Sequence, residues 1–449
     1  MTQPVTSYAL FGNTADVWPV AAMLAAQLPS RIQITVIESA SGEGDRLVLP
    51  LEDPYFEALG VTARDLAGAG ADFALGQALD GFLGEGTRVI AAPSGDLPAI
   101  AGLALHQVLR AVADKAGALD RLAELYEGFR FCACAAAEGR MALADDAPQS
   151  PLAMLGPLVV IDQARLTALL RGRIAEERVL RLEGQVTAIE RGEGGEARTA
   201  QLGDGRSVEA DMFIDLRYPS EPVVQGEHIP LPLLEALASS NASIMAQPSA
   251  AAMPTYIASP GATGGEVSPY ALTQPWRGNL VRLGPASAAL GPLFSADGRL
   301  LLSQCRQFAE CLPARTGMAV EARRFNRLHA RTIERLYELV ALPLHLNRRE
   351  EPAWKALREI APPGGLALRI EQFRSRGHLP ECDGELVDRQ FWIDLLMVFG
   401  VVPQRHDRRA EAFAPRQLDS ALGTIRRELD TALAAMPTRA RFMERFGDR

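Results

Sequence analysis

A glycine turn followed by an acid is the first pattern in the sequence that could do chemistry. Gly12 ends a short apolar stretch at residues 8–11, and Glu38 ends a second apolar stretch further along. Glycine lets backbone N–H groups approach a diphosphate, and an acid after the second strand can accept hydrogen bonds from a ribose. The pattern therefore predicts a dinucleotide site whose candidate residues are Gly12, Asn13, Thr14 and Glu38.

The same turn departs from the glycine pattern that usually holds a diphosphate. Read as G-x-G-x-x-G, its three glycine positions hold Gly12, Thr14 and Val17, so two glycines are missing. Asp16 adds a carboxylate, which would cost on the order of several kcal/mol beside a diphosphate at an effective dielectric constant of about 20. Because Pro19 suits the first turn of a helix, we expect Asp16 near the N-cap. The turn predicts a dinucleotide fold in which the helix's own carboxylate takes the phosphate position.

Hydrophobic periodicity predicts the elements that position this turn. Residues 8–11 and 32–37 have the pattern of β-strands, and the Ala- and Leu-rich residues 20–28 between them have that of a helix. This order is the βαβ opening of a dinucleotide-binding fold. Further along, the predicted elements are helical segments at 51–90 and 99–130, strands at 186–190, 197–202 and 212–215, and helices from Val320 onward.

Composition limits the classes of function. The chain has 449 residues, 48% hydrophobic and 22% charged, as expected for a globular protein with a large core. Its net charge of −9 argues against a surface that coats nucleic acid. We see no signal peptide, no apolar run of the roughly 18 residues that a membrane span needs, and no disulfide framework among five cysteines. We therefore expect a cytoplasmic protein that binds neither nucleic acid nor membrane.

Other reactive side chains give weaker signals. Cys132 and Cys134 form an isolated C-x-C pair, and H-E-x-x-H and G-x-S-x-G are absent, so we predict no metal site and no serine hydrolase. The Arg-rich residues 405–409 include an acid, which favours a solvated face, with partner docking as the alternative. The last helix carries an apolar stripe that predicts packing onto the protein's own body, with a partner or dimer contact as the alternative. The stripe consists of Leu418, Leu422, Ile425, Leu429 and Leu433.

Seven segments spread over the chain match one family together. They are TVIES at 35–39, ADFALG at 71–76, GRSVEADMFID at 205–215, WRGNLVRLG at 276–284, HLNRR at 345–349, Trp354, and GVVP at 400–403. With these segments the chain resembles the flavin-dependent tryptophan halogenases, from Tyr8 to Phe413. In that family the first segment belongs to the FAD-binding start, the second to a helix with the active-site lysine, and the fourth leads into the tunnel between flavin and active site.

The resemblance implies a chemistry for which this chain lacks two side chains. In the family, reduced FAD and oxygen give a hydroperoxide that oxidises halide to hypohalous acid, a lysine delivers the halogen to an arene, and a glutamate assists. The positions that match the lysine and the glutamate hold Ala74 and Phe294, which have no proton chemistry. The two lysines of the chain, Lys115 and Lys355, fall in other segments.

Two further family signatures are missing. The family's W-x-W-x-I-P motif aligns with residues 243–248, where only Pro248 agrees. Tyr218 matches the glycine that ends the second flavin strand, and we expect its ring to intrude on the space of the flavin. The resemblance implies the remaining flavin contacts at Asp215, Gly284 and Ser295.

These observations predict an α/β fold. We expect a flavin-monooxygenase-like, FAD-binding Rossmann-type box with β-sheet insertions, and a helical C-terminal part. We assign residues 1–330 to the α/β domain, with an interleaved β-sheet substrate part, and residues 331–449 to a helical region packed on it.

Two functions follow from the missing signatures. We favour a pseudoenzyme, a halogenase homologue that has lost halogenation chemistry and acts as a binding or partner protein. It would pair with an active halogenase paralogue, form a homodimer or hold an aromatic small molecule. The alternative is an FAD-dependent halogenase or monooxygenase with altered catalytic residues that acts on a tryptophan- or indole-like substrate. FAD enters both hypotheses through the resemblance.

Overall fold

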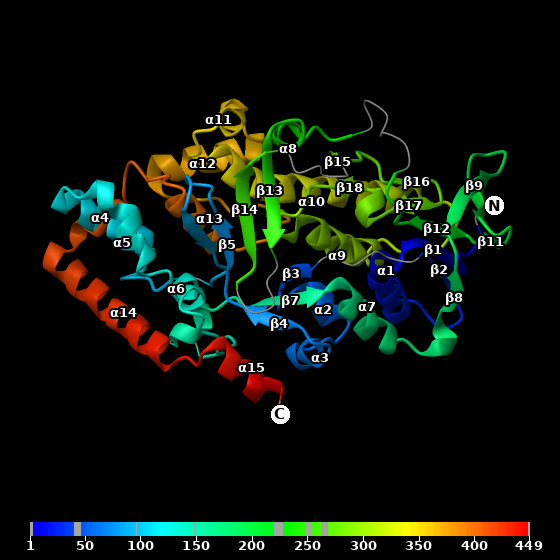
Figure 1. The fold of residues 1–449 in the computed structure, drawn as a ribbon, viewed down its shortest axis with the longest axis horizontal. Coiled ribbons are helices and arrows are strands. Elements are labelled where there is room, and N and C mark those ends of the chain that lie inside the picture. The colour runs from blue at the N-terminus through cyan, green and yellow to red at the C-terminus, as the bar shows by residue number, and fades with distance from the viewer. Residues whose placement is uncertain are drawn as a thin grey trace. The chain divides into compact units, whose positions relative to one another are not determined.

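The chain folds into two compact units, each assembled from separate stretches of sequence (Figure 1). The computed structural model describes residues 3–39, 46–95, 97–147, 150–219, 228–247, 253–261 and 268–447. The first unit comprises Met1–Ala71, Ile161–Glu235 and Gly265–Leu336, and the second comprises Asp72–Val160, Ala236–Gly264 and Tyr337–Arg449. The predicted boundary after residue 330 divides the chain once, whereas these units alternate along it.

A six-stranded sheet forms the centre of the first unit. Its strands, in spatial order, are β16 (Trp276–Arg277), β17 (Leu280–Arg282), β12 (Met212–Asp215), β1 (Ser7–Asn13), β2 (Gln33–Ser39) and β8 (Leu180–Glu183). All neighbours are parallel except β16, which pairs antiparallel with β17. Helix α1 (Thr14–Gln27) connects β1 to β2, so the predicted βαβ opening is confirmed.

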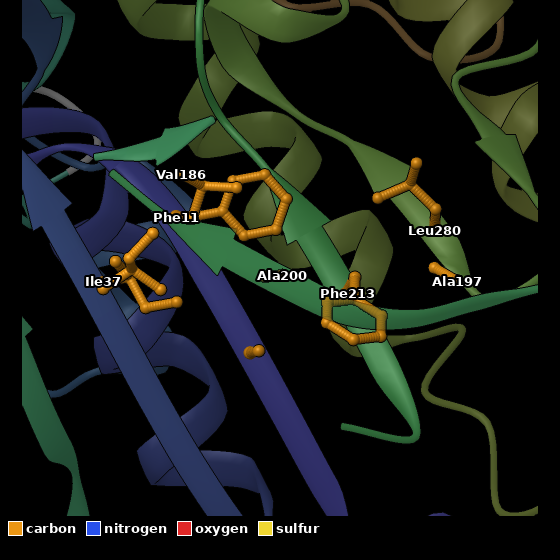
Figure 2. Packing of buried hydrophobic residues seen from close by; sticks show 9 residues of the cluster. Phe11, Ile37, Val186, Ala197, Ala200, Phe213 and Leu280 are labelled. Atoms are coloured by element: carbon orange, nitrogen blue, oxygen red, sulfur yellow. The ribbon is translucent and has the colours of Figure 1, made fainter. Parts of the chain in front are cut away.

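Apolar side chains join this sheet to a second, three-stranded antiparallel sheet. The second sheet consists of β11 (Ser207–Glu209), β10 (Ala197–Leu202) and β9 (Val186–Arg191). Figure 2 shows Phe11 and Phe213 of the large sheet in one buried cluster with Val186. Because side chains alternate along a strand, Leu10 faces the opposite side of the large sheet from Phe11. Both faces of β1 are buried, as is usual for parallel sheets.

The first unit contains further helices and short strands. They are β3 (Arg46–Pro50), α2 (Pro54–Ala58), α3 (Ala63–Gly68), α7 (Gln163–Gly172), β15 (Tyr270–Ala271), β18 (Ala288–Ala289) and α9 (Ala296–Ala309). Helix α1 packs against α7 and α9.

A four-stranded sheet lies in the second unit, and two of its strands, β5 (Gln77–Asp80) and β6 (Arg88–Ala91), fall where the sequence pattern predicts helix. Its spatial order is β13 (Ala242–Gln247), β14 (Thr255–Pro260), β5 and β6. The prediction of a helical segment over residues 51–90 is therefore wrong beyond α3. The physical reason is the turn between β5 and β6, where Gly81, Gly84 and Gly86 all have positive φ and turn the chain back on itself.

Helices are the predominant secondary structure after residue 331, which confirms the predicted helical C-terminal part. The predicted helix over 99–130 is broken at Gly117, which has φ 64° and ends the first piece with a left-handed cap. The pieces and the later helices are α4 (Leu105–Ala116), α5 (Leu122–Glu127), α6 (Phe131–Ala137), α11 (Pro352–Glu359), α12 (Gly364–Arg376), α13 (Arg389–Val398), α14 (Pro415–Ala435) and α15 (Arg439–Gly447).

Three further elements span the residues where one unit gives way to the other in the sequence. They are β7 (Leu158–Asp162), α8 (Pro232–Ala238) and α10 (Ala319–His345). Across the residues that the structure describes, we find no helix with the length and apolar character needed to cross a bilayer.

The apolar stripe of α14 packs within the second unit. Leu418, Leu422, Leu429 and Leu433 are buried, and α14 contacts α4 and α6. Packing onto the protein's own body, the favoured prediction, is therefore confirmed.

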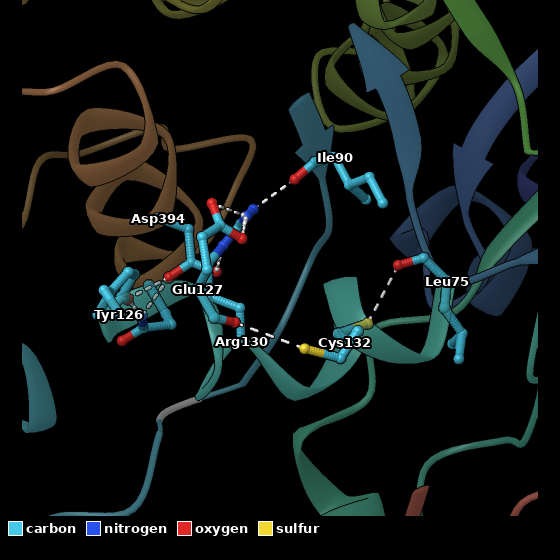
Figure 3. Close-up of polar contacts among 9 residues, drawn as sticks. Leu75, Ile90, Tyr126, Glu127, Arg130, Cys132 and Asp394 are labelled. Carbon is cyan, nitrogen blue, oxygen red and sulfur yellow. Dashed lines mark hydrogen bonds and ion pairs between the residues drawn. The ribbon is translucent and has the colours of Figure 1, made fainter. Parts of the chain in front are cut away.

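A buried arginine stabilises the second unit from within. Arg130 and Asp394 are both almost fully buried, with 3.6 Å between Nε and Oδ2 (Figure 3). Arg130 Nη1 donates to both carboxylate oxygens of Glu127, at 2.9 and 2.8 Å, and its guanidinium also donates to the backbone carbonyl of Ile90. Tyr126 donates its hydroxyl to Asp394 at 2.5 Å. These contacts tie α5 and α6 to strand β6 and helix α13.

The C-x-C cysteines lie on α6, so the pair is helical rather than extended. Cys132 donates its thiol to the carbonyl of Leu75 at 3.1 Å (Figure 3), and Cys134 to the carbonyl of Glu127 at 3.5 Å. Burial raises the pKa of Cys132 to about 12, so this thiol stays protonated at neutral pH. The contacts are those of structural cysteines.

Candidate functional site

The β1–α1 turn lies at the carboxyl end of the parallel strands, where dinucleotide sites form. Strand β1 continues to Asn13, and α1 follows without an intervening loop. Asn13 is the N-cap, Asp16 the third residue of the helix and Pro19 the sixth. The prediction that Pro19 belongs to the first turn is therefore wrong, because the helix begins earlier than Pro19 suggests, whereas Asp16 lies in the first turn, near the N-cap, as predicted.

Side chains of this turn bind the neighbouring strand. Thr14 Oγ1 donates to the carbonyl of Ser39 at 3.0 Å, and Ser39 Oγ donates to the carbonyl of Gly12 at 3.2 Å and to Asn13 Oδ1 at 3.3 Å. A Cβ atom on Gly12 would lie 2.9 Å from Leu216 Cβ. The glycine is therefore required by the packing of β1 against the segment after β12, with or without a phosphate.

Asp16 occupies the end of α1 that would attract an anion. Asp16 is 9% exposed, and its Oδ1 accepts a hydrogen bond from Gln163 Nε2 at 3.3 Å. A carboxylate in the first turn is favoured by the helix dipole and by free backbone N–H groups, which are the same features that bind a phosphate. The helix supplies its own anion at this end.

Glu38 is held on both carboxylate oxygens by other residues of the first unit. Oε2 accepts a hydrogen bond from the indole Nε1 of Trp18 at 2.9 Å, and Oε1 is ion-paired with Arg181 of β8. Burial raises the pKa of Glu38, but the hydrogen bonds from Trp18 and Arg181 outweigh it, so the pKa is lowered and the carboxylate stays charged. The guanidinium of Arg171 lies over the Trp18 ring at 4.9 Å. Residue Glu38 is 3% exposed.

Asp215, at the end of β12, is paired in the same way. Arg217 binds it with two contacts, Nε to Oδ1 at 2.9 Å and Nη2 to Oδ2 at 2.8 Å. Arg217 also donates to the carbonyl of Val186 at 2.7 Å and lies over the Phe11 ring at 4.8 Å. The next residue, Tyr218, is 49% exposed, and its predicted intrusion on a flavin stays a prediction.

Gly284 takes part in a buried polar network. Its φ is +51°, and its N–H donates to Gln304 Oε1 at 2.6 Å. Gln304 Nε2 donates to Ser287 Oγ at 2.8 Å and to His329 Nδ1 at 2.9 Å, while His329 Nε2 donates to the carbonyl of Leu272 at 2.9 Å. His329 is therefore neutral with the proton on Nε2, and the network fixes the turn that contains Gly284.

Two buried histidines, His329 of this network and His106 of α4, predict a loss of stability at mildly acidic pH. Burial lowers the pKa of His329 to about 4, and burial lowers the pKa of His106 to about 4 as well. Both histidines have a pKa of roughly 6.5 when unfolded, so the unfolded chain binds more protons as the pH falls. Between pH 8 and pH 5 each should reduce the free energy of unfolding by about 2 kcal/mol. Denaturant titrations at several pH values check this.

A matched variant assigns the effect. A proton on Nδ1 of His329 would face the amide donor of Gln304. His329→Gln keeps a donor toward Leu272 and cannot titrate. We expect it to remove about half of the dependence over this pH range and to leave the part that comes from His106, and an unchanged slope would contradict the prediction.

Phe294 and Ser295 form a strained turn directly before α9. Both are non-glycine residues with left-handed backbone, with φ of 57° and 51°. Such residues cost on the order of 1–3 kcal/mol each and persist where the surroundings hold them. Phe294 is buried and its carbonyl accepts from Arg299 Nε at 3.0 Å, while Ser295 Oγ accepts from the N–H of Val48 at 3.0 Å. The phenyl ring of Phe294 is thus part of the core.

The N-terminus of α9 also holds its own carboxylate. Asp297 lies in its first turn and accepts hydrogen bonds from the N–H groups of Leu290 at 2.6 Å and Gly291 at 3.3 Å. As at α1, a charged side chain of the protein takes the position that a helix N-terminus offers to an anion.

Ala74 lies on a strand, β4 (Asp72–Ala74), so the prediction that residues 71–76 form a helix is wrong. The strand pairs antiparallel with β7, with Ala74 opposite Leu158. Two aromatic rings of α15, those of Phe442 and Phe446, pack against the neighbouring residue Phe73 at centroid distances of 6.4 and 5.6 Å. Ala74 is 7% exposed, and its methyl group can neither bind nor carry a halogen.

The two lysines are engaged elsewhere in the second unit. Lys115, in the last turn of α4, donates to the carbonyl of Phe413 at 3.4 Å. Lys355 of α11 forms an ion pair with Glu350 at 2.7 Å. Of residues 243–248, those up to Gln247 belong to β13, and Pro248 lies outside the described residues. Within the described part of the chain, no group of three His, Cys, Asp or Glu side chains could hold a metal ion.

The parallel sheet with its glycine turn defines a Rossmann-type dinucleotide-binding box. The family model described as tryptophan halogenase matches residues 9–217 and 250–415. The chain therefore belongs to the tryptophan halogenase family, whose flavin-dependent halogenases are oxidoreductases that imply FAD.

Solved structures of flavin-dependent halogenases have the same fold. One from Brevundimonas sp. BAL3 is 22% identical with a TM-score of 0.82, covering 98% of this chain and 99% of that one. One from Xanthomonas campestris is 21% identical with a TM-score of 0.81, covering 99% of both chains. The tryptophan halogenase from Shewanella frigidimarina NCIMB 400 is 14% identical with a TM-score of 0.78, covering 99% and 98%.

The described residues fit the adenosine diphosphate half of FAD poorly. A ribose would have to displace the Trp18 indole or Arg181 from Glu38, and a diphosphate at the start of α1 would lie beside Asp16. From the sequence, Glu38 and Asp16 could be identified as residues that decide whether this site accepts a dinucleotide. The contacts of Trp18, Arg171 and Arg181 at the same site could not be identified.

Proposed function

We propose that this member of the tryptophan halogenase family is a cytoplasmic binding or partner protein that does not halogenate through a lysine. The observation that carries the proposal is Glu38, whose two oxygens are engaged by Trp18 and Arg181. An acid that serves a ribose must be accessible to its hydroxyl groups, and this one is buried with a side chain on each oxygen.

Two replacements support the same conclusion. Ala74 and Phe294 stand at the lysine and glutamate positions, and neither side chain can transfer a proton or form a haloamine. Both lysines have other contacts, with Phe413 and Glu350. The expected binding partners are an aromatic small molecule, an active halogenase paralogue or a second copy of the chain.

One observation favours the alternative function. Phe294 and Ser295 retain left-handed backbone, and such strain is commonly kept at functional sites. It favours an FAD-dependent halogenase or monooxygenase with altered catalytic residues, acting on a tryptophan- or indole-like substrate.

Flavin titration separates the two functions. The purified full chain is examined by visible absorption and titrated with FAD and reduced FAD, followed by flavin fluorescence. We expect a colourless protein without low-micromolar binding. In a second assay with a flavin reductase, halide and tryptophan or indole, we expect no halogenated product by mass spectrometry.

Each outcome assigns a function. Tight flavin binding together with halogenated or hydroxylated product would contradict the proposal and establish the enzyme. Gel filtration of the full chain, alone and mixed with an active halogenase, tests the partner role, since a stable complex shifts the elution volume.

A further inference from the structure

The Arg-rich segment at residues 405–409 lines a concavity of the second unit that the proposed function does not use. The concavity has a volume of about 530 Å³, within the usual range of small-molecule sites. Its lining residues are Asp114, Gln404, Arg405, His406, Arg408 and Glu411.

Helix α4 fixes the segment that forms this concavity. Arg110 is buried and donates through Nε to the carbonyl of Pro403 at 2.7 Å and through Nη2 to that of Gln404 at 2.8 Å. Gln107 Oε1 accepts the N–H of Asp407 at 2.9 Å. Three backbone groups of residues 403–407 are thus held in place, so the concavity is preformed.

Three hydrogen-bond donors of the lining lack partners within the described part of the chain. Arg405 and Arg408 are exposed and make no ion pair there, whereas the adjacent Arg409 is paired with Asp407 at 2.7 Å. His406 Nε2 is buried and has no hydrogen-bond partner among the described residues. A buried polar atom without a partner is unfavourable, which points to a group that is bound there.

The two carboxylates of the lining do not satisfy His406. Asp114 lies 3.8 Å from Nδ1 and Glu411 lies 3.7 Å from Nε2, both beyond hydrogen-bonding distance. Asp114 is also paired with Arg110 at 3.3 Å, which offsets its charge. The unpaired charges that remain are two guanidinium groups and the exposed Glu411.

We propose that this concavity binds an oxyanion, the carboxylate or phosphate group of a small molecule. Guanidinium groups match such groups with paired hydrogen bonds, and Arg405 and Arg408 would supply them. The Nε2–H of His406 would donate the third bond. Glu411 competes with the ligand, so its charge limits the affinity.

Titration of the full chain tests this proposal. Protein labelled with ¹³C in its histidine rings is titrated with inorganic phosphate and, separately, with acetate at constant ionic strength. His406 is assigned by His406→Gln. We expect a saturable shift of the His406 signal with at least one anion. Phosphate alone would identify a phosphate group, acetate alone a carboxylate, and both a general oxyanion site.

Variants of the same segment give matched controls. Arg405→Ala and Arg408→Ala should each weaken binding about threefold to tenfold, and the double variant should abolish it. Glu411→Gln should tighten binding. Arg409→Ala has the same net charge as Arg405→Ala and Arg408→Ala, and it should leave binding unchanged. No saturable shift with either anion would overturn the proposal, as would an Arg409→Ala effect equal to that of Arg405→Ala.

Discussion

Replacing Arg130 with methionine is expected to lower the free energy of unfolding by about 3–5 kcal/mol. The side chain is 2% exposed and binds Glu127, Asp394 and the carbonyl of Ile90 at once. Methionine fills much of the volume but leaves the Asp394 carboxylate buried without a cation and the carbonyl without a donor. Removing one partner of a buried pair costs more than removing both, since a buried charge remains.

A double-mutant cycle tests this explanation. Asp394→Asn should destabilise the native protein but stabilise the Arg130→Met variant, because asparagine is neutral and still accepts the hydroxyl of Tyr126. Denaturant titrations followed by tryptophan fluorescence measure all four proteins. As the surface control, Arg121→Met removes a well-exposed ion pair with Glu124 and should change nothing measurable. An Arg130→Met effect no larger than this control, or additive single effects, would contradict the prediction.

The parts of the fold that follow from local pattern could be predicted from the sequence. The apolar runs ending at Gly12 and Glu38 form the first two strands of the large sheet, and α1 joins them. The strands at 186–191, 197–202 and 212–215 form where glycine turns separate β-prone segments. In each case the hydrophobic periodicity and the flanking glycines determine the element within a few residues. The tertiary contacts agree with this local preference.

Short elements and distant contacts could not be predicted in the same way. Residues 72–74 are too few for a period to distinguish strand from helix, and their pairing with β7 decides the structure. Arg181 reaches Glu38 from 143 residues away, because β8 pairs with β2. The position of Trp18, one turn into the helix that follows the glycine turn, indicates that its indole lies near the site. Only the folded sheet shows that this indole donates a hydrogen bond to Glu38.

Opening the turn should create affinity for FAD. In the variant Asp16→Ala with Trp18→Phe, the carboxylate leaves the start of α1 and Glu38 Oε2 loses its indole donor while a ring still fills the space. Removing a like charge a few Å from a diphosphate is worth on the order of several kcal/mol at an effective dielectric constant of about 20. We expect FAD to bind at least about tenfold more tightly than to the native protein, as measured by flavin fluorescence.

The controls separate the causes of weak binding. Asp204→Ala changes the net charge equally at an exposed site and should leave FAD binding unchanged. ADP carries the ribose and diphosphate without the flavin ring, so a gain for ADP without a gain for FAD would place the remaining obstruction in the flavin half of the site, at Tyr218 or at another residue. If neither ligand gains affinity, Asp16 and Trp18 do not block the site, and the explanation of Glu38 as an occupied acceptor is wrong. Because Trp18→Phe also removes a buried hydrogen bond, unfolding curves of the variant are needed to show that the first unit remains folded.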